Sequence, residues 1–168
     1  MEVRRLGPAD AEELWRVRSE ALEREPASFG ESLEEHLGIP RARLAERLGA
    51  SSADGFVYGA FEESSKLVAM AGFFRETRRK RRHRGVIWGV YVSAGHRGRG
   101  LGRAVMIAAL AAARELQGLR YVYLSVTSAQ SPARDLYLSL GFRPFGREPG
   151  ALAVDGQYFD EEHMILEL

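Results

Sequence analysis

The stretch VIWGVYVSAGHRGRGLGR, residues 86–103, decides the fold. Apart from one glycine, its first seven residues are β-branched or aromatic, which is typical of a strand. Three glycines then alternate with longer residues. A run rich in alanine and leucine follows over residues 100–116 and predicts a helix that ends at Gly118. The segment therefore predicts a strand, a glycine-rich loop and a helix in succession.

The glycine-rich loop has the features of a phosphate site. Glycine permits positive φ and close approach, so successive backbone N–H groups can converge on phosphate oxygens. The N-terminus of the following helix adds a favourable electrostatic potential. Arg97, Arg99 and Arg103 add positive charge for a polyphosphate.

Two common nucleotide signatures do not fit this loop. A P-loop requires Lys and Ser or Thr directly after its last glycine, but Leu101 and Gly102 follow Gly100. A dinucleotide fingerprint requires Gly or Ala where Arg103 or Val105 stands. The phosphate ligand is therefore neither of these nucleotide types.

The loop resembles the pyrophosphate loop of the GCN5-related N-acetyltransferase (GNAT) superfamily, whose pattern is Arg/Gln-x-x-Gly-x-Gly/Ala. Residues 97–102, RGRGLG, match this pattern fully. A second block of the superfamily, Ala-x-x-Leu-Tyr-x-x-x-Gly-Phe, matches residues 133–142, ARDLYLSLGF. The resemblance is close over residues 86–142 and looser elsewhere.

The resemblance implies an α+β (mixed α/β) chain with the acyl-CoA N-acyltransferase fold, as a single N-acetyltransferase domain over residues 1–168. That fold has three layers, with helices flanking a mostly antiparallel sheet of six or seven strands. The sheet is splayed where the strands at residues 86–92 and 121–126 part. The other predicted strands are residues 3–6, 56–61, 67–74, 142–145 and 158–166, and the other predicted helices begin after Pro8, near Ser28, at Pro40 and at Ser131.

The implied activity is transfer of the acetyl group of acetyl-CoA, as cosubstrate and without a metal, to a primary amine of a small molecule or peptide in a ternary complex. The resemblance assigns the pantetheine arm to Val90, Tyr91 and Val92. It assigns the pyrophosphate to Arg97, Gly98, Arg99, Gly100, Leu101, Gly102 and Arg103. Gln130 stands where the second block of the family begins with Asn, so it too is a predicted cofactor contact. Tyr137 is implied to protonate the departing thiolate, and its alternative role is that of a core tyrosine.

The general base is not assigned by the resemblance. Many relatives carry a glutamate on the strand before the loop, where Trp88 stands here. An amine with a pKa of about 10 is mostly protonated at neutral pH, so a proton acceptor is needed. The candidates are Glu31, Glu34, Glu35, Glu76 and His163. The aromatic residues Phe29 and Phe159 are candidates for the rim of the acceptor cleft, and a core position is the preferred alternative for each.

The composition of the 168 residues, 45% hydrophobic with a net charge of +1, favours one compact core and no general polyanion binding. The absence of cysteine excludes disulfides and a thiolate nucleophile. No apolar run predicts a signal peptide or a membrane span, so we expect a cytoplasmic protein.

The basic run RRKRRHR, residues 78–84, is predicted as a solvated hairpin tip. Nucleic-acid binding is disfavoured because no aromatic residues interleave with the arginines, and attraction of CoA phosphates or an acidic substrate is a further alternative. A noncatalytic acyl-CoA-binding sensor or interaction domain is the rival function. The sequence does not identify the acceptor amine, and a homodimer is one possible oligomeric state.

Overall fold

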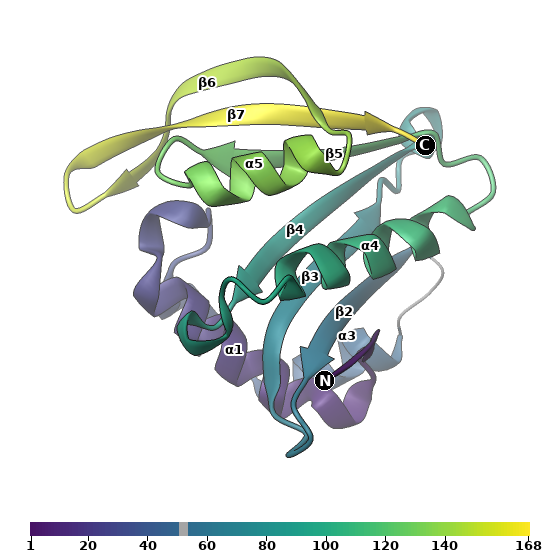
Figure 1. Cartoon of the computed structure of the whole chain (residues 1–168), viewed down its shortest axis with the longest axis vertical. Coiled ribbons are helices and arrows are strands. Elements are labelled where there is room, and N and C mark those ends of the chain that lie inside the picture. The colour runs from purple at the N-terminus through teal and green to yellow at the C-terminus, as the bar shows by residue number, and fades with distance from the viewer. Residues whose placement is uncertain (51–53) are drawn as a thin grey trace.

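A seven-stranded sheet in the order β1-β2-β3-β4-β5-β7-β6 forms the centre of the computed structural model, which describes residues 1–50 and 54–168 (Figure 1). The strands are β1 (Glu2–Arg5), β2 (Gly55–Phe61), β3 (Leu67–Arg75), β4 (Arg84–Val92), β5 (Tyr121–Thr127), β6 (Arg143–Val154) and β7 (Gln157–Glu167). The helices are α1 (Ala11–Arg24), α2 (Leu33–Leu37), α3 (Arg41–Gly49), α4 (Leu101–Arg114) and α5 (Ser131–Ser139). Short 3-10 turns are η1 (Pro8–Asp10), η2 (Pro26–Ser28), η3 (Arg79–Arg81) and η4 (Ala94–His96).

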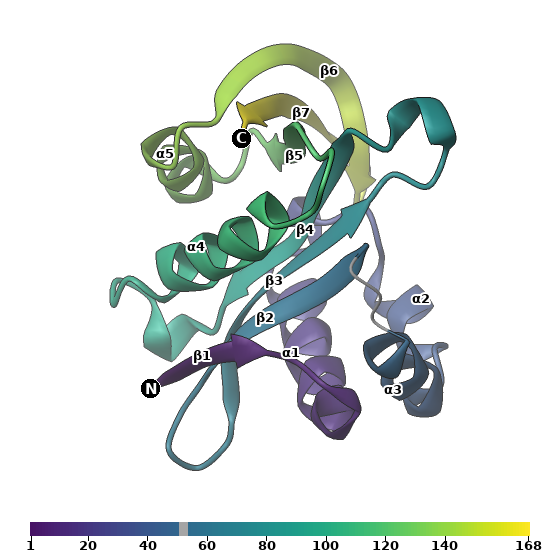
Figure 2. The same ribbon diagram turned by 90° about the vertical axis from the view of Figure 1, so that its right-hand side faces the viewer.

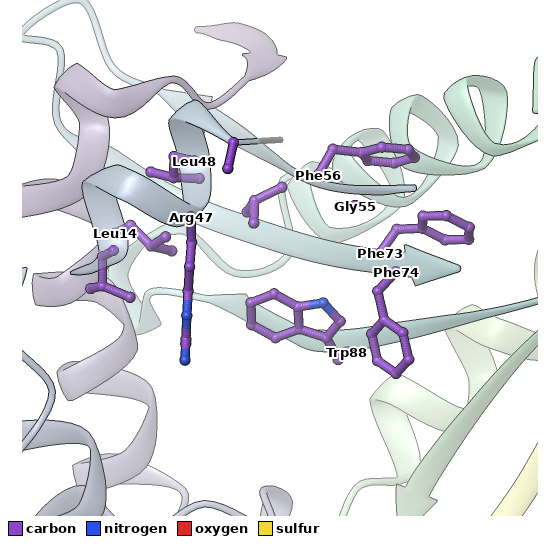
Figure 3. Close-up of a pocket in the computed structure, with 11 residues that line it drawn as sticks. Leu14, Arg47, Leu48, Gly55, Phe56, Phe73, Phe74 and Trp88 are labelled. Atoms are coloured by element: carbon purple, nitrogen blue, oxygen red, sulfur yellow. The ribbon is translucent and has the colours of Figure 1, made fainter. Parts of the chain in front are cut away.

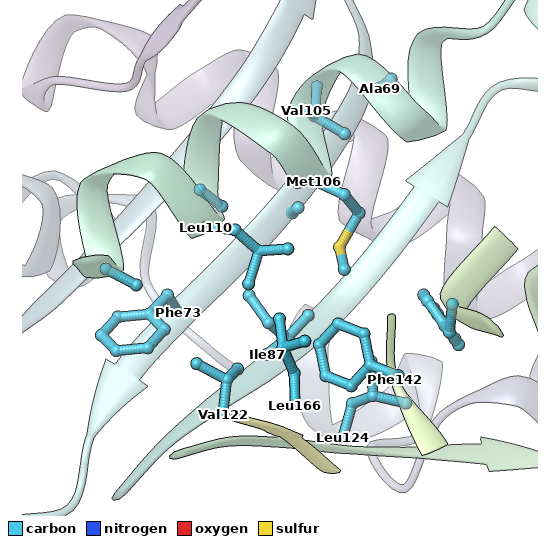
Figure 4. Packing of buried hydrophobic residues seen from close by; sticks show 14 of the residues in the cluster. Ala69, Phe73, Ile87, Val105, Met106, Leu110, Val122, Leu124, Phe142 and Leu166 are labelled. Atoms are coloured by element: carbon cyan, nitrogen blue, oxygen red, sulfur yellow. The ribbon is translucent and has the colours of Figure 1, made fainter. Parts of the chain in front are cut away.

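The helices cover both faces of the sheet and give three layers. Helices α4 and α5 lie on one face, and α1, α2 and α3 lie on the other (Figure 2). The larger core cluster joins α4 and α5 to the sheet through Val105, Met106, Ile87, Val122 and Phe142 (Figure 4). The first seven residues of β3 are all buried, because this strand is covered on both faces. The predicted α+β fold class is therefore confirmed.

Helix α4 packs against the sheet, but only in part. Its apolar residues extend nearly all round, which predicts burial against a sheet. Val105 and Leu110 are buried, whereas Ile107 is 48% exposed and Ala111 is also exposed. The expected burial is therefore found on one face of the helix, and small alanine side chains make up much of the other.

Strands β4 and β5 part after a short paired segment. They are the only parallel neighbours in the described sheet, and they pair over just three positions, from Arg84 opposite Tyr121 to Val86 opposite Tyr123. Further along, β4 contains an irregularity in its pairing with β3, where Gly89 has a φ of 63°. A bulge of this kind bends a strand. The edge of β4 that faces β5 beyond Val86 is therefore left without a strand partner, as the predicted splay requires.

Among the residues described, no helix is long and apolar enough to cross a membrane.

Asp10 joins β1 to the start of α1 and gives a first test of the fold. Its carboxylate accepts hydrogen bonds from Arg4 at 2.7 and 2.8 Å and from the Gly7 N–H at 2.8 Å. The Arg4 hydrogen bonds, helped by the Gly7 amide, lower the pKa of Asp10 against the opposing effect of its burial. Asp10→Ala should therefore lower the free energy of unfolding by about 1–2 kcal/mol, and Tm by roughly 2–8 °C at pH 7.

The pH dependence of this effect has a defined sign. Since the pKa of Asp10 is lower in the folded chain, its contribution is present above the unfolded value of about 3.9. It is lost as the pH falls through the folded-state pKa, so wild type and Asp10→Ala should converge in acid. Glu2→Ala is the control, because Glu2 is exposed and lies 3.9 Å from Arg4. Equal melting of wild type and Asp10→Ala at pH 7 would contradict this role.

Candidate active site

A cavity of about 420 Å³ lies beside β4, between the N-terminus of α4 and helix α5. It brings together eleven of the twelve residues that the sequence indicated for the site. These are Val90, Tyr91, Val92, Arg97, Gly98, Gly100, Leu101, Gly102, Arg103, Gln130 and Tyr137. Arg99 is the exception, because its exposed side chain does not line the cavity.

The loop at one end of this cavity presents free backbone amides. Gly98 and Gly100 have φ values of 73° and 76°, and Gly100 is the N-cap residue of α4. The amides from Gly98 to Arg103 donate to no acceptor among residues 1–50 and 54–168, and the first amide of the helix with a partner is that of Ala104. Free amides at a helix N-terminus attract anions. The loop therefore presents the kind of free amides that suit an anion such as a phosphate.

The arginine side chains of the loop contact other parts of the protein. Arg97 donates to the Val92 carbonyl at 3.0 Å and forms an ion pair with Glu25. Arg103 donates to the Ser139 hydroxyl at 2.8 Å. The amides are thus the groups of this loop that remain free to bind a phosphate, while the guanidinium groups add positive charge nearby.

Glu25 is a residue of the site that the sequence did not indicate. It lies between α1 and η2 and lines the cavity, although it is 72 positions from Arg97 and 105 from Gln130 in the chain. The Gln130 amide donates to Glu25 at 2.7 Å and to Ser28 at 2.6 Å. Gln130 therefore links the loop before α5 to the segment after α1. No local pattern marks Glu25, because its partners are distant in sequence.

Tyr91 contributes its backbone to the cavity. Its side chain packs on the opposite face of the sheet, where the hydroxyl donates to Glu20 at 3.0 Å. Burial, together with this hydrogen bond, raises the pKa of Tyr91 to about 12. The phenol of Tyr91 is therefore a structural group, and the free edge of β4 is what faces the cavity at this position.

A second cavity of about 80 Å³ fills the gap between β4 and β5. It shares five lining residues with the first cavity, namely Glu25, Val90, Gln130, Ala133 and Tyr137. Tyr137 is 6% exposed, and burial raises the pKa of its phenol far above the ordinary range. The hydroxyl therefore stays protonated at the junction of the two cavities.

The structure places the five candidate general bases in different surroundings. Glu31 pairs with Arg18 at 3.0 Å, Glu35 caps its own helix through Ser32, and Glu76 lies 3.7 Å from Arg81. Glu34 lies on α2 and lines neither cavity. His163 on β7 bonds to Ser125, which lines the second cavity. Of the candidates, His163 is the one connected to the gap.

The predicted rim residues have different outcomes. Phe29 lines the second cavity together with Trp88, which occupies the position where relatives carry a glutamate. Phe159 lies on β7, is half-buried and lines neither of the two cavities. Its register puts it opposite Leu152, near the end of the β6–β7 hairpin.

A third cavity of about 470 Å³ lies between α3 and the strands β2 to β4 (Figure 3). Leu14, Arg47 and Leu48 line it from the helices, and Phe73, Phe74 and Trp88 line it from the strands. Trp88 also lines the second cavity, so this residue borders both spaces.

The basic run of residues 78–84 lies far from the phosphate loop. It connects β3 to β4 and contains η3, and Arg82 pairs with Asp54 at 2.9 Å. The run ends at the first residue of β4, so the other eight residues of that nine-residue strand separate it from the loop, a span of about 26 Å at the usual rise of a strand. Direct contact with a phosphate in the loop is therefore excluded, and the run is a surface connection between two strands.

A glycine-rich loop with free amides that leads to a gap between splayed strands is the arrangement expected of the acyl-CoA N-acyltransferase fold. Residues 14–142 match the family described as "Acetyltransferase (GNAT) family". The chain therefore belongs to the GNAT acetyltransferase family, and the expected resemblance is confirmed.

Solved structures agree with this assignment at the level of the fold. A GNAT acetyltransferase from Streptococcus pneumoniae is 23% identical with a TM-score of 0.87, and the match covers 99% of each chain. The putative acetyltransferase yncA from Salmonella typhimurium, solved with acetyl-CoA, is 23% identical with a TM-score of 0.85 and covers 100% of this chain and 94% of its own. A phosphinothricin acetyltransferase from Sinorhizobium meliloti, in complex with AcCoA, is 19% identical with a TM-score of 0.83. The match covers 99% of this chain and 88% of that enzyme's chain. A search of curated proteins found no match.

Proposed function

We propose that the chain transfers the acetyl group of acetyl-CoA to a primary amine of a small molecule or peptide by direct attack in a ternary complex. The observation that carries the proposal is the meeting of the two cavities at Tyr137. One cavity begins at a loop of free amides, and the other fills the gap between β4 and β5. The acetyl-CoA complexes of two proteins with the same fold support this choice of cosubstrate.

The cofactor would be held mainly by backbone groups. The amides from Gly98 to Arg103 would bind the pyrophosphate, with added charge from the loop arginines. The pantetheine arm would pair with the free edge of β4 at Val90, Tyr91 and Val92, like an added strand. This arrangement directs the thioester from the loop toward the gap.

Within the gap, two groups would act on the thioester. A backbone N–H near the Gly89 bulge, at Val90 or Tyr91, would polarise the carbonyl oxygen as the amine attacks. The Tyr137 hydroxyl would donate its proton to the sulfur as the carbon–sulfur bond breaks. Direct transfer needs little beyond this, because it depends chiefly on holding the two reactants together.

Binding and turnover test the proposal separately. Acetyl-CoA at 100 times its Kd should stabilise the chain by about 2.7 kcal/mol, which corresponds to a rise in Tm of roughly 5–11 °C. Release of free thiol from acetyl-CoA should then depend on an added amine from a panel of metabolites and peptides. Binding without thiol release for any amine would contradict the enzyme proposal and favour the acyl-CoA-binding sensor.

A further inference from the structure

A chain of three hydrogen-bonded side chains crosses β5, β7 and β6. The Ser125 hydroxyl lies 2.8 Å from Nδ1 of His163, and Nε2 of His163 lies 3.0 Å from the Glu148 carboxylate. Ser125 and His163 are opposite one another in the antiparallel pairing of β5 with β7. The contact is therefore fixed by strand register, which positions side chains more precisely than a loop does.

These residues lie on the face of the sheet away from α4 and α5. Along β5, Leu124 and Val126 pack in the core cluster of those helices, and side chains alternate along a strand. Ser125 therefore points to the other side. Ser125 lines the cavity in the gap that Tyr137 also lines. Ser125 and Tyr137 therefore line the same small space, with Tyr137 on the α5 face of β5 and the Ser125 side chain directed to the other face.

For a neutral His163, the partners fix the direction of the hydrogen bonds. The ionised Glu148 carboxylate can only accept, so Nε2 of a neutral His163 carries the hydrogen and donates it. Nδ1 then has a lone pair that accepts from the Ser125 hydroxyl. This polarity is that of a serine, histidine and carboxylate array, in which the imidazole can take the hydroxyl proton.

Resting on the function proposed above, we propose that Ser125, His163 and Glu148 form a relay that removes the proton of the acceptor amine. Ser125 is the catalytic residue, because its oxygen contacts the acceptor. His163 and Glu148 are positioning residues that act through Ser125, with His163 receiving the proton. The proposal accounts for the missing acid on β4, where Trp88 stands.

Carboxylates face His163 from two strands. Glu148 faces it from β6, and Glu161 faces it from β7 itself, opposite Glu148 in the β6–β7 pairing. The Phe145 ring lies 6.1 Å from the imidazole. Burial raises the pKa of Glu161, and the charge of His163 opposes that shift. A proton received by His163 would therefore lie beside two acidic groups.

Arg84 is a further charged residue on the same face of the sheet. The Arg84 guanidinium of β4 lies over the Tyr123 ring, 4.0 Å from its centroid. Tyr123 precedes Ser125 by two positions on β5, so the two side chains point to the same side. On the face that carries the relay, the Arg84 guanidinium therefore contacts the Tyr123 ring.

The proton balance of the reaction closes. The acceptor ammonium gives one proton to the Ser125 oxygen while the hydroxyl proton of Ser125 moves to Nδ1 of His163, which later releases it to solvent. The neutral amine attacks the thioester carbon, the carbon–nitrogen bond forms, and the carbon–sulfur bond breaks with its electron pair on sulfur. Sulfur takes the proton of Tyr137, and the second proton lost by the nitrogen restores the phenol.

Ser125→Ala and His163→Gln test the relay. Each should lower kcat/KM for the amine about a hundredfold at pH 7, with the acetyl-CoA Kd and Tm unchanged. The double variant should lose little more, because the two residues act as one unit. Both variants should regain activity near pH 10, where the amine is neutral without help. A purely structural role would not give this recovery at high pH.

Two controls distinguish the relay from the mere loss of a histidine and from a metal site. His83→Gln removes a histidine whose ring packs on Tyr121 at the far end of β4, and it should leave the pH profile unchanged. Glu148, Glu161 and His163 could also hold a metal ion, since their ligand atoms lie within 4.8 Å of one another. Activity of the wild type should therefore be unaffected by EDTA, and loss with EDTA that added metal restores would overturn the relay.

Failure of the relay is distinguishable from failure of the proposed function. Wild-type rates and pH profiles in both variants, with an active wild type, would overturn the relay alone. A wild type that releases no thiol with any amine would overturn the proposed function itself.

Discussion

Tyr137→Phe is expected to lower kcat by a factor of about 10²–10³ while changing the Kd of acetyl-CoA by less than about twofold. The phenol lies at the junction of the two cavities, and burial keeps it protonated. Loss of the proton donor leaves the thiolate to depart unaided, whereas the cofactor is held by amides of the loop. Steady-state kinetics and calorimetry on the same preparation measure the two quantities.

The substitution should not impair folding. The Tyr137 ring packs edge to face against Phe142 at 6.1 Å, and phenylalanine retains that contact. Tyr121→Phe is the matched control, since Tyr121 lies at the closed end of the splay, opposite Arg84. Tyr121→Phe should behave as wild type. If kcat of Tyr137→Phe equals that of wild type, Tyr137 is a core tyrosine and its role as the acid is wrong.

Replacing both Gly98 and Gly100 with alanine should weaken acetyl-CoA binding about a hundredfold. Both glycines have φ values near 75°, and the added Cβ atoms would meet no neighbour within 4 Å. The cost is therefore backbone strain, about 1–2 kcal/mol per residue. Relief of that strain would rotate the peptides and turn the amides of the loop away from the pyrophosphate. Calorimetric titration with acetyl-CoA measures the loss.

Gly95→Ala isolates the effect of the backbone conformation. Gly95 precedes the same loop and also has open space around its Cβ position, but its φ is not in the left-handed region. The affinity of the Gly95→Ala variant for acetyl-CoA should match that of wild type. Equal affinity of the double variant and Gly95→Ala would mean that the amides do not bind the cofactor in this conformation.

The sequence predicted those parts of the fold and the site that depend on local signals. Glycines with positive φ and the N-terminus of α4 are each determined by a few consecutive residues. Residues of both motif blocks, including Tyr137, line one cavity. The predicted number of strands and the site of the splay also agree with the structure.

Features that depend on strand register could not be predicted. Strand β6 continues to Val154, well past the predicted end at residue 145. The prediction stopped early because Pro144, Pro149 and Gly150 interrupt the β pattern of the sequence. An edge strand tolerates these residues, and register shifts absorb them. Ser125 is 38 positions from His163, so only the pairing of β5 with β7 reveals their contact.

The cytoplasmic location of the protein and its possible assembly into a homodimer stay predictions.

The most direct test is a crystal structure of this chain with acetyl-CoA bound. We expect the pyrophosphate oxygens within about 3.2 Å of the amides between Gly98 and Arg103, and the thioester sulfur within hydrogen-bonding reach of the Tyr137 hydroxyl. A pyrophosphate bound away from this loop, or a sulfur on the far side of β5 from Tyr137, would contradict the account.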